Sequence, residues 1–253
     1  MTYFGFLVRF LAGPIVALLV FLSWSARWGG PAARQGRKAF WLAVAVQVFL
    51  AVVYTTPWDN YLVAHGVWYY NPAQVSGILI GYVPIEEYIF FVLQAVLIGL
   101  LWQSLYDRFH SAEPLHPSPK SRIWSSAAIL LPWLASLWLL VAGWKPVTYM
   151  GLILVWALPP IGLQLAFGAD ILWQQRRLVA AVILIPVLYL SVADAVAIRQ
   201  GIWTIDAAQS TGIFIGALPL EEGLFFFLTV VLLAFGMTLS LAAESRVRLA
   251  ALR

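Results

Sequence analysis

Seven apolar stretches, separated by short polar segments, dominate the pattern of hydrophobic positions along the chain. An α-helix needs about 20 residues to cross the ~30 Å hydrocarbon core of a bilayer, and each stretch is close to that length or longer. They cover residues 4–25, 39–57, 76–105, 124–143, 147–168, 178–197 and 213–241. The pattern predicts an all-α integral membrane protein with seven transmembrane helices. The third and seventh stretches contain Pro84 and Pro219, where we expect the helix to kink or break.

The composition agrees with a lipid environment. The 253 residues are 62% hydrophobic and 10% charged, whereas soluble domains are about 25% charged. The net charge of +4 does not predict a nucleic-acid partner, because the basic residues lie in short runs between apolar stretches. The chain has no cysteine, and its three histidines lack metal-ligand spacing, so the sequence predicts no metal site.

The basic residues also predict an orientation. Twelve of the fifteen Lys and Arg residues fall on one side of the predicted helices, and only Arg9, Lys145 and Arg199 fall elsewhere. The twelve are Arg27, Arg34, Arg37, Lys38, Arg108, Lys120, Arg122, Arg176, Arg177, Arg246, Arg248 and Arg253. The positive-inside rule predicts a multi-pass protein of the cell membrane, with its N-terminus outside and its C-terminus in the cytoplasm.

An internal repeat joins the two halves of the chain. Residues 59–91 align without a gap onto 194–226, with matching Asp, Gly, Trp, Gln, Pro, Glu and Phe residues. The offset of 135 would carry the first three helices onto the last three and leave the fourth as a connector. We therefore expect two parallel three-helix repeats, related by an axis along the membrane normal. The predicted units are 1–110 and 147–253, joined by a cytoplasmic loop and connecting helix over 111–146.

Each repeat carries the sequence Pro-x-Glu-Glu, and its glutamates are the candidate catalytic residues. They are Glu86 and Glu87 in the first repeat and Glu221 and Glu222 in the second. If the third stretch were helical throughout, Glu86 would lie ~15 Å into it, near the middle of the bilayer. Ionisable groups at that depth are costly and usually functional. Because adjacent carboxyl groups in a low dielectric cannot both ionise cheaply, each pair would offer a proton donor beside an acceptor.

A simpler interpretation of Pro-x-Glu-Glu is the start of a helix. Proline is favoured at the first helical position and acidic residues in the first turn. Pro84 and Pro219 would then begin interfacial helices. The two interpretations can combine, since a broken helix would aim its first turn into a cavity.

Other duplicated side chains are candidates for roles around the acids. Aromatic rings can stabilise a cation, so Trp68, Trp203 and the four phenylalanines of the two Phe-Phe pairs are candidate substrate-binding residues. These pairs are Phe90 with Phe91 and Phe225 with Phe226. Asp59, Asp194, Gln74 and Gln209 are candidate supporting residues, although Asp59 and Asp194 are equally well explained as ordinary helix-end residues.

These motifs resemble those of the lycopene cyclase domain family. The resemblance rests on Pro84-Ile85-Glu86-Glu87 with Phe90-Phe91, preceded by Pro57-Trp58-Asp59-Asn60 and Gly66-Val67-Trp68-Tyr69. The second repeat has Pro219-Leu220-Glu221-Glu222 with Phe225-Phe226, but Asp194-Ala195-Val196 where the first has Asp59-Asn60-Tyr61. The resemblance covers nearly the whole chain. That family includes two-chain bacterial cyclases and fused archaeal and fungal ones.

The resemblance implies a lycopene β-cyclase, an isomerase of carotenoid biosynthesis acting on a lipid-soluble carotenoid. Cyclisation of lycopene to γ-carotene and then β-carotene adds a proton to a terminal double bond, closes a ring and releases another proton. Because the reaction is redox-neutral and the chain has no Gly-x-Gly-x-x-Gly after a strand, we expect no flavin and no other cofactor.

Other functions remain compatible with parts of the pattern. A cyclase for longer carotenoids, or one forming ε rings, would use the same acids. A proton-coupled transporter with parallel repeats could also bury paired glutamates, although the Phe-Phe pairs are unlike a polar pore. A retinal protein is excluded, since no lysine lies in the last stretch.

Overall fold

The computed structural model describes residues 1–25 and 36–251, and within them seven helices are long and apolar enough to span a membrane. The first span is continuous from Tyr3 to Trp24 and is built from α1 (Tyr3–Leu7), the π-helical turn η1 (Val8–Ala12) and α2 (Gly13–Trp24). The others are α4 (Arg37–Ala64), α5 (Ile85–Phe109), α6 (Pro119–Val141), α7 (Thr148–Gln174, preceded by the 3₁₀ turn η3, Lys145–Val147), α8 (Arg176–Arg199) and α9 (Leu220–Leu241). The predicted seven-helix fold is confirmed.

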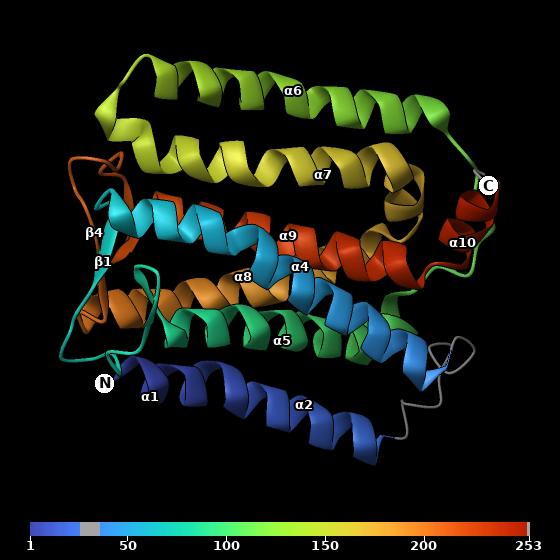
Figure 1. The fold of residues 1–253 in the computed structure, drawn as a ribbon. Helices are drawn as coiled ribbons and strands as arrows, with labels where there is room; N and C mark the ends of the chain where they lie inside the picture. Colours follow the sequence, from blue (N-terminus) through green and yellow to red (C-terminus); the bar gives the residue numbers. More distant parts are fainter. Residues whose placement is uncertain (26–35, 252–253) are drawn as a thin grey trace.

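The described residues outside the spans include six short strands and one more helix. Strands β1 (Trp68–Tyr70) and β4 (Trp203–Ile205) pair with each other, whereas β2 (Leu79–Ile80) with β3 (Val83–Pro84) and β5 (Phe214–Ile215) with β6 (Leu218–Pro219) form two hairpins. Helix α10 (Ala243–Ala250) follows α9. The chain therefore adds a small β cap to one end of a helical bundle (Figure 1).

The two hairpins correct the predicted starts of the third and seventh helices. The expected helices began at 76 and 213, but α5 begins at Ile85 and α9 at Leu220. Pro84 and Pro219 lie just before them with extended backbone, because proline has no N–H for a helical hydrogen bond. Gly81 and Gly216 form the hairpin turns with φ of 69° and 66°. The Glu pairs consequently lie in the first turn of their helices, and the continuous third helix on which the mid-bilayer position of Glu86 depended is not formed.

The two halves of the chain are related by a pseudo-two-fold axis. Tyr69 pairs with its repeat counterpart Thr204 at the centre of the β1–β4 ladder, so the axis passes through this pair. Helices α4 and α8, and α5 and α9, correspond at the offset of 135. Helix one does not: Tyr3 N–H donates to Gln74 O and Tyr149 N–H to Gln209 O, so α1–α2 corresponds to α7 at an offset of 146. Twelve residues separate α2 from α4, whereas one separates α7 from α8.

The helices surround a central pair. Figure 1 shows α5 and α9 running in the same direction through the middle of the bundle, as parallel repeats require, with α6 on the periphery against α7. Side chains of α5 and α9 are mostly buried, whereas α6 leaves Trp124, Leu131 and Val141 largely exposed. The centre of the bundle is therefore formed jointly by both repeats, and α6 presents its apolar surface outward.

The two ends of the bundle differ, because the strands lie at one end and most of the basic residues at the other. The N-terminus and all described strands lie at one end, and α10 lies at the other (Figure 1). Nine of the twelve basic residues used to predict the orientation lie at the α10 end, while Arg27, Arg34 and Arg253 lie outside the described residues. At this end Arg248 of α10 makes two hydrogen bonds, of 3.0 and 2.8 Å, to the Asp170 carboxylate of α7.

Candidate active site

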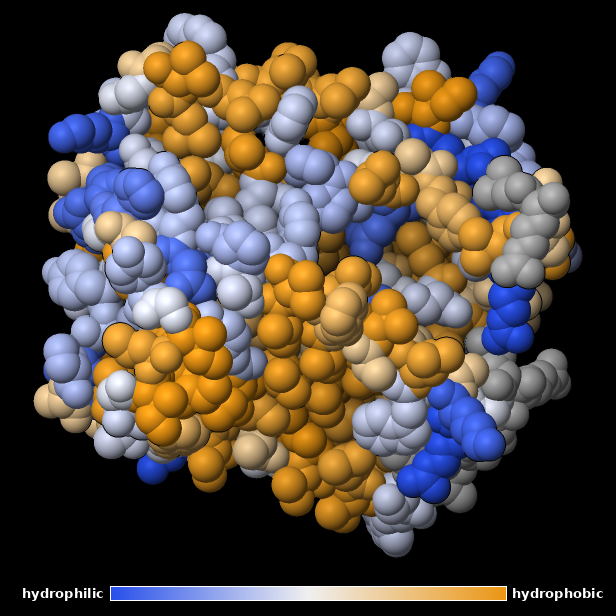
Figure 2. Space-filling view, in the orientation of Figure 1, coloured by the Kyte–Doolittle hydropathy of each residue, from blue (hydrophilic) through white to orange (hydrophobic). Residues whose placement is uncertain are grey.

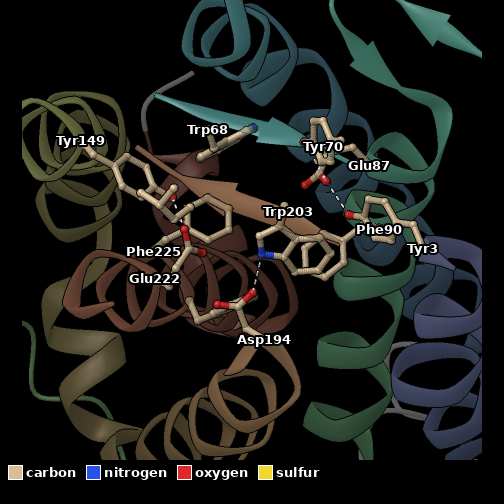
Figure 3. A pocket seen from close by; sticks show the side chains of 12 residues that line it. Tyr3, Trp68, Tyr70, Glu87, Phe90, Tyr149, Asp194, Trp203, Glu222 and Phe225 are labelled. Carbon is tan, nitrogen blue, oxygen red and sulfur yellow. Dashed lines mark hydrogen bonds between the residues drawn. The ribbon is translucent and has the colours of Figure 1, made fainter. Parts of the chain in front are cut away.

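A small pocket lies beneath β1 and β4, where α5 and α9 begin (Figure 3). Its volume is about 30 Å³, which is above the minimum that a buried water molecule needs. The twelve lining residues come from both repeats, and they are Tyr3, Trp68, Tyr70, Glu87, Phe90, Tyr149, Asp194, Trp203, Ile205, Glu222, Phe225 and Phe226. The pseudo-two-fold axis therefore brings the two Glu-containing motifs to one shared site.

Only the second glutamate of each motif lines this pocket. Glu87 accepts hydrogen bonds from the hydroxyl groups of Tyr3 and Tyr70, the latter at 3.0 Å. Glu222 accepts one from Tyr149 at 2.7 Å. Tyr3 and Tyr149 are equivalent under the offset of 146, so each repeat supplies the same carboxyl–phenol pair. Both glutamates are nearly inaccessible to solvent.

The first glutamate of each motif anchors a loop. Glu86 accepts hydrogen bonds from the Ser76 N–H at 2.6 Å and from the Ser76 hydroxyl at 3.1 Å. Glu221 accepts one from the Thr211 N–H at 2.6 Å. Both side chains are fully buried. These carboxyl groups hold the segments before each hairpin against the start of the following helix.

The two aspartates lie on α4 and α8 beside the glutamates, with different partners. Asp194 accepts a hydrogen bond from the Trp203 indole N–H at 2.9 Å. Its counterpart Asp59 has no hydrogen-bond partner for either carboxyl oxygen within the described residues, and neither does the indole N–H of Trp68. Both aspartates are 1% exposed. The pseudo-symmetry is therefore broken at the side chains nearest the acids.

Tyr70 gives Glu87 a donor that stays protonated. This residue lies in β1, outside the helical spans, and is packed against Tyr3 with ring centroids 6.1 Å apart. Burial, together with the nearby carboxyl groups of Asp59 and Glu87, raises the pKa of the Tyr70 hydroxyl well above its usual value. The phenol is consequently neutral at physiological pH and available to donate to Glu87.

The other predicted site residues divide between the pocket and its frame. Phe90, Phe225 and Phe226 line the pocket, but Phe91 faces a separate cavity between α4 and α7. Gln74 and Gln209 lie in the loops and link the repeats: Gln74 donates to Gln200 O at 3.1 Å, and Gln209 to Gly66 O at 3.1 Å. Pro84 and Pro219 end the hairpins and fix where the Glu-bearing helices begin.

Sequence reasoning missed the tyrosines. Tyr3, Tyr70, Tyr149 and Ile205 line the pocket, and none was a candidate. Aligning the first helix with the fifth at a constant offset placed Tyr3 out of register with Tyr149. An alignment that allowed a gap between the first and second helices would have matched the two tyrosines, together with Pro14 and Pro160. No such signal existed for Tyr70, whose counterpart is Ile205.

The assembled pocket is suited to proton transfer next to an apolar guest. It combines glutamates, an aspartate and phenols with tryptophan and phenylalanine rings, and no Lys or Arg lines it. Aromatic faces stabilise cations, and carboxyl groups can donate and accept protons. Among residues 1–25 and 36–251, no three His, Asp or Glu side chains are placed to hold a metal ion.

Comparisons with a family model and with individual relatives point to the same protein family. The lycopene cyclase family model matches residues 13–105 and 147–240, one segment in each repeat. A lycopene beta-cyclase of Halobacterium salinarum is 40% identical over 238 residues, covering 94% of this chain and 95% of the relative. A bifunctional lycopene cyclase/phytoene synthase of Gibberella fujikuroi is 35% identical over 199 residues, covering 75% of this chain and 33% of the relative.

A second fungal relative, a bifunctional lycopene cyclase/phytoene synthase of Sporisorium reilianum, is 38% identical over 200 residues, covering 73% of this chain and 28% of the relative. No solved structure matches the chain. The family model covers most of the chain in the two segments that the internal repeat predicts, and the resemblance seen in the motifs is confirmed. The chain belongs to the lycopene cyclase family.

Proposed function

We propose that the protein is a lycopene cyclase that closes β rings at the ends of lycopene, forming γ-carotene and then β-carotene. One observation supports this most directly: two buried Glu–Tyr pairs, Glu87 with Tyr3 and Glu222 with Tyr149, face one aromatic pocket. The similarity to a lycopene beta-cyclase over nearly the full length of both chains supports the same substrate.

The chemistry requires a proton donor, a cation-tolerant wall and a proton acceptor. The donor adds a proton to the terminal double bond, and the electron pair of a neighbouring double bond closes the six-membered ring. Loss of a proton from the ring then restores a neutral product. One proton enters and one leaves, so the residues of the pocket suffice for the acid–base steps.

We assign the donor role to Glu222 and the acceptor role to Glu87. Two phenols donate to Glu87 and one to Glu222, and hydrogen bonds donated to a carboxylate favour its charged form. Both glutamates and Asp194 line the same small pocket. For the next turnover the proton taken up by Glu87 has to be lost and Glu222 has to be protonated again. Trp68 and Trp203, with Phe90, Phe225 and Phe226, would surround the carbocation.

The protein would act within the cell membrane, with its β cap and N-terminus outside and α10 in the cytoplasm. The basic residues gathered at the α10 end support this orientation. We take residues 1–110 and 147–253 as the two functional units and 111–146 as their connector. The pocket would then receive substrate from the outer half of the bilayer.

Expression in a bacterium that accumulates lycopene tests the activity, with pigments separated by chromatography. We expect γ-carotene and β-carotene to replace lycopene. The purified protein in detergent should give the same products from lycopene without added flavin or nicotinamide. Unchanged lycopene, products with ε rings, or a strict need for reduced flavin would each contradict the proposal as stated.

A further inference from the structure

A second cavity opens on the side of the bundle between α4 and α7. Its volume is about 190 Å³, and Figure 2 shows a hollow in the middle of this face. It is lined by Gln47, Leu50, Ala51, Tyr54, Thr55, Phe91, Gln94, Trp156, Pro160, Gln164, Phe225, Thr229, Leu232 and Leu233. Leu50, at its mouth, is 50% exposed. Since α4 and α7 are transmembrane spans, this opening faces lipid.

The cavity adjoins the acid pocket. Phe225 lines both, and it lies three residues after Glu222 on the same face of α9. The lining of the cavity then continues along α9 to Leu233, which is ~16 Å from Glu222 at the helical rise per residue. The two cavities are therefore neighbours, and Phe225 lies at the boundary between them.

Phe225 belongs to a cluster of three aromatic rings from three helices. The ring centroid of Trp58 of α4 is 4.6 Å from that of Trp156 of α7 and 5.8 Å from that of Phe225 of α9, and the Trp156 and Phe225 centroids are 6.2 Å apart. The Trp58 indole N–H donates to Leu152 O at 3.0 Å. Phe225 lines both cavities and Trp156 lines the larger one, so this cluster lies at the boundary between the cavity and the pocket.

The positions that line the cavity are occupied differently on the other side of the pseudo-two-fold axis. The hydrogen bond from Tyr54 to Trp156 O is repeated there from Tyr189 to Phe10 O, so the two sides superimpose. Yet Gln47 and Thr55, which line the cavity, correspond to the apolar residues Val182 and Leu190. Trp58 corresponds to Ala193. The polar groups and the large ring beside this cavity are therefore a feature of one side and not a consequence of the fold.

We propose that the cavity between α4 and α7 binds the polyene chain of the substrate and delivers its end past this aromatic cluster to Glu222. This inference rests on the proposed carotenoid substrate. A rod about as long as the ~30 Å hydrocarbon core fits with one end at the acids, one part in the cavity and the rest in lipid. The aromatic faces of Tyr54, Phe91 and Trp156 supply flat surfaces for a conjugated chain.

Single cysteines test the path directly, because the chain has none of its own. Leu50→Cys places a thiol at the mouth of the cavity, and Ile185→Cys places one at the equivalent position on the other side of the axis. Both parent residues are about half exposed, at 50% and 48%. A membrane-soluble maleimide is applied to each purified variant, with lycopene, with a saturated hydrocarbon of similar length, or with neither.

We expect lycopene to slow labelling of Leu50→Cys by about fivefold or more and to leave Ile185→Cys unchanged, because only the first thiol is covered by bound substrate. Labelled Leu50→Cys should also lose about tenfold or more in turnover relative to the same variant before labelling. Gln164→Cys and its equivalent Leu18→Cys form a second pair on α7 and α2, so misfolding of one variant does not prevent the test.

The outcomes separate this inference from the proposed function. Equal labelling of both members of each pair in lycopene would overturn the path. Equal protection by the saturated hydrocarbon would assign the cavity to lipid chains instead. If the parent protein does not cyclise lycopene at all, the proposed function fails independently of the labelling result.

Discussion

The two glutamates of each motif differ in what they contact. Glu87 and Glu222 receive phenol hydrogen bonds inside the pocket, whereas Glu86 and Glu221 receive backbone hydrogen bonds from the loops. In each motif, therefore, the second glutamate lies in the pocket and the first holds a loop in place. Because adjacent positions on a helix are ~100° apart, one motif can serve both.

The first prediction follows from this division. Glu87→Gln and Glu222→Gln keep the size of the side chain but remove its acid–base function, so each should lower turnover of lycopene about 10²-fold or more. Glu86→Gln and Glu221→Gln are the matched controls, and they should mainly lower the melting temperature. Chromatographic rates and thermal unfolding would be measured on all four. A larger loss of turnover in the controls would reverse the assignment.

A second prediction concerns the unequal number of phenols. Tyr3 and Tyr70 both donate to Glu87, but Tyr149 alone donates to Glu222. Tyr149→Phe should therefore reduce kcat more than Tyr3→Phe or Tyr70→Phe, by about tenfold for the loss of one charge-assisted hydrogen bond. Kinetics of the three single variants and of the Tyr3→Phe/Tyr70→Phe double variant would be compared. A double variant no worse than either single one would contradict the sharing of Glu87.

The roles of individual residues could be predicted only in part from the sequence. The repeat and the cost of burying carboxyl groups identified the four glutamates, but the choice between neighbours depends on loops whose course has no local signal. The match of Tyr3 with Tyr149 was missed because twelve residues separate α2 from α4 and only one separates α7 from α8. That difference shifts the register of the first helix and conceals the match of Tyr3 with Tyr149.

At the scale of elements, each hairpin is held by its contact with a helix. Asn60 of α4 accepts a hydrogen bond from Tyr82 N–H at 2.8 Å and donates to the Tyr88 hydroxyl at 3.0 Å. Gly81 leaves room for Asn60, because a Cβ at this glycine would collide with the Asn60 amide. The equivalent Gly216 has open space beside it.

Alanine substitutions at these two glycines should therefore differ. Both positions have positive φ, so each substitution carries a backbone cost of ~1–2 kcal/mol. Gly81→Ala should destabilise the protein further by displacing Asn60 and weakening the hairpin above Glu86. Melting temperatures in detergent would be compared for the two variants. An equal decrease would show that the Asn60 contact contributes little.

A further element-scale prediction concerns α10. The Arg248–Asp170 pair joins α10 to α7, and the Asp170 side chain is 1% exposed. Arg122 also lies 3.8 Å from Asp170, so Arg248→Gln removes the nearer of two cations and its charge-assisted hydrogen bonds. The substitution should lower stability by ~1.5–3 kcal/mol and expose α10 to protease. Arg246→Gln is the control, because Arg246 lies on the same helix and the structure gives it no ion pair with a described acid. Similar digestion of both variants would show that the Arg248–Asp170 pair does not hold α10 against α7.

The helices themselves were the most predictable elements. Runs of apolar residues set their number and approximate positions, since a bilayer demands about 20 such residues per span. Their starts were less predictable where the preceding segment was also apolar. Residues 75–83 are mostly apolar, like the helix that follows them. However, Gly77 and Gly81 have positive φ and Pro84 lacks an N–H, so the segment forms a hairpin.

At the scale of the whole molecule, the parallel repeats place both Glu–Tyr pairs at one end of the bundle. Substrate can then react at only one of its two ends while bound. We expect a distributive reaction, in which monocyclic γ-carotene is released before β-carotene forms. A time course at large substrate excess should show γ-carotene rising first. β-Carotene appearing without a monocyclic lag would indicate two separated reaction centres.

Duplication inside one chain also explains how the cavity on one side of the axis can coexist with a differently occupied equivalent on the other side. In a homodimer of one three-helix unit, every substitution would appear on both sides of the axis. Trp58 could not then face Ala193 across that axis, nor Gln47 face Val182. Fusion of the copies frees each half to change alone, so one flank can specialise for admitting a long guest while the other is given over to stability. By this reasoning, a symmetrised variant carrying either half twice would have two such cavities or none.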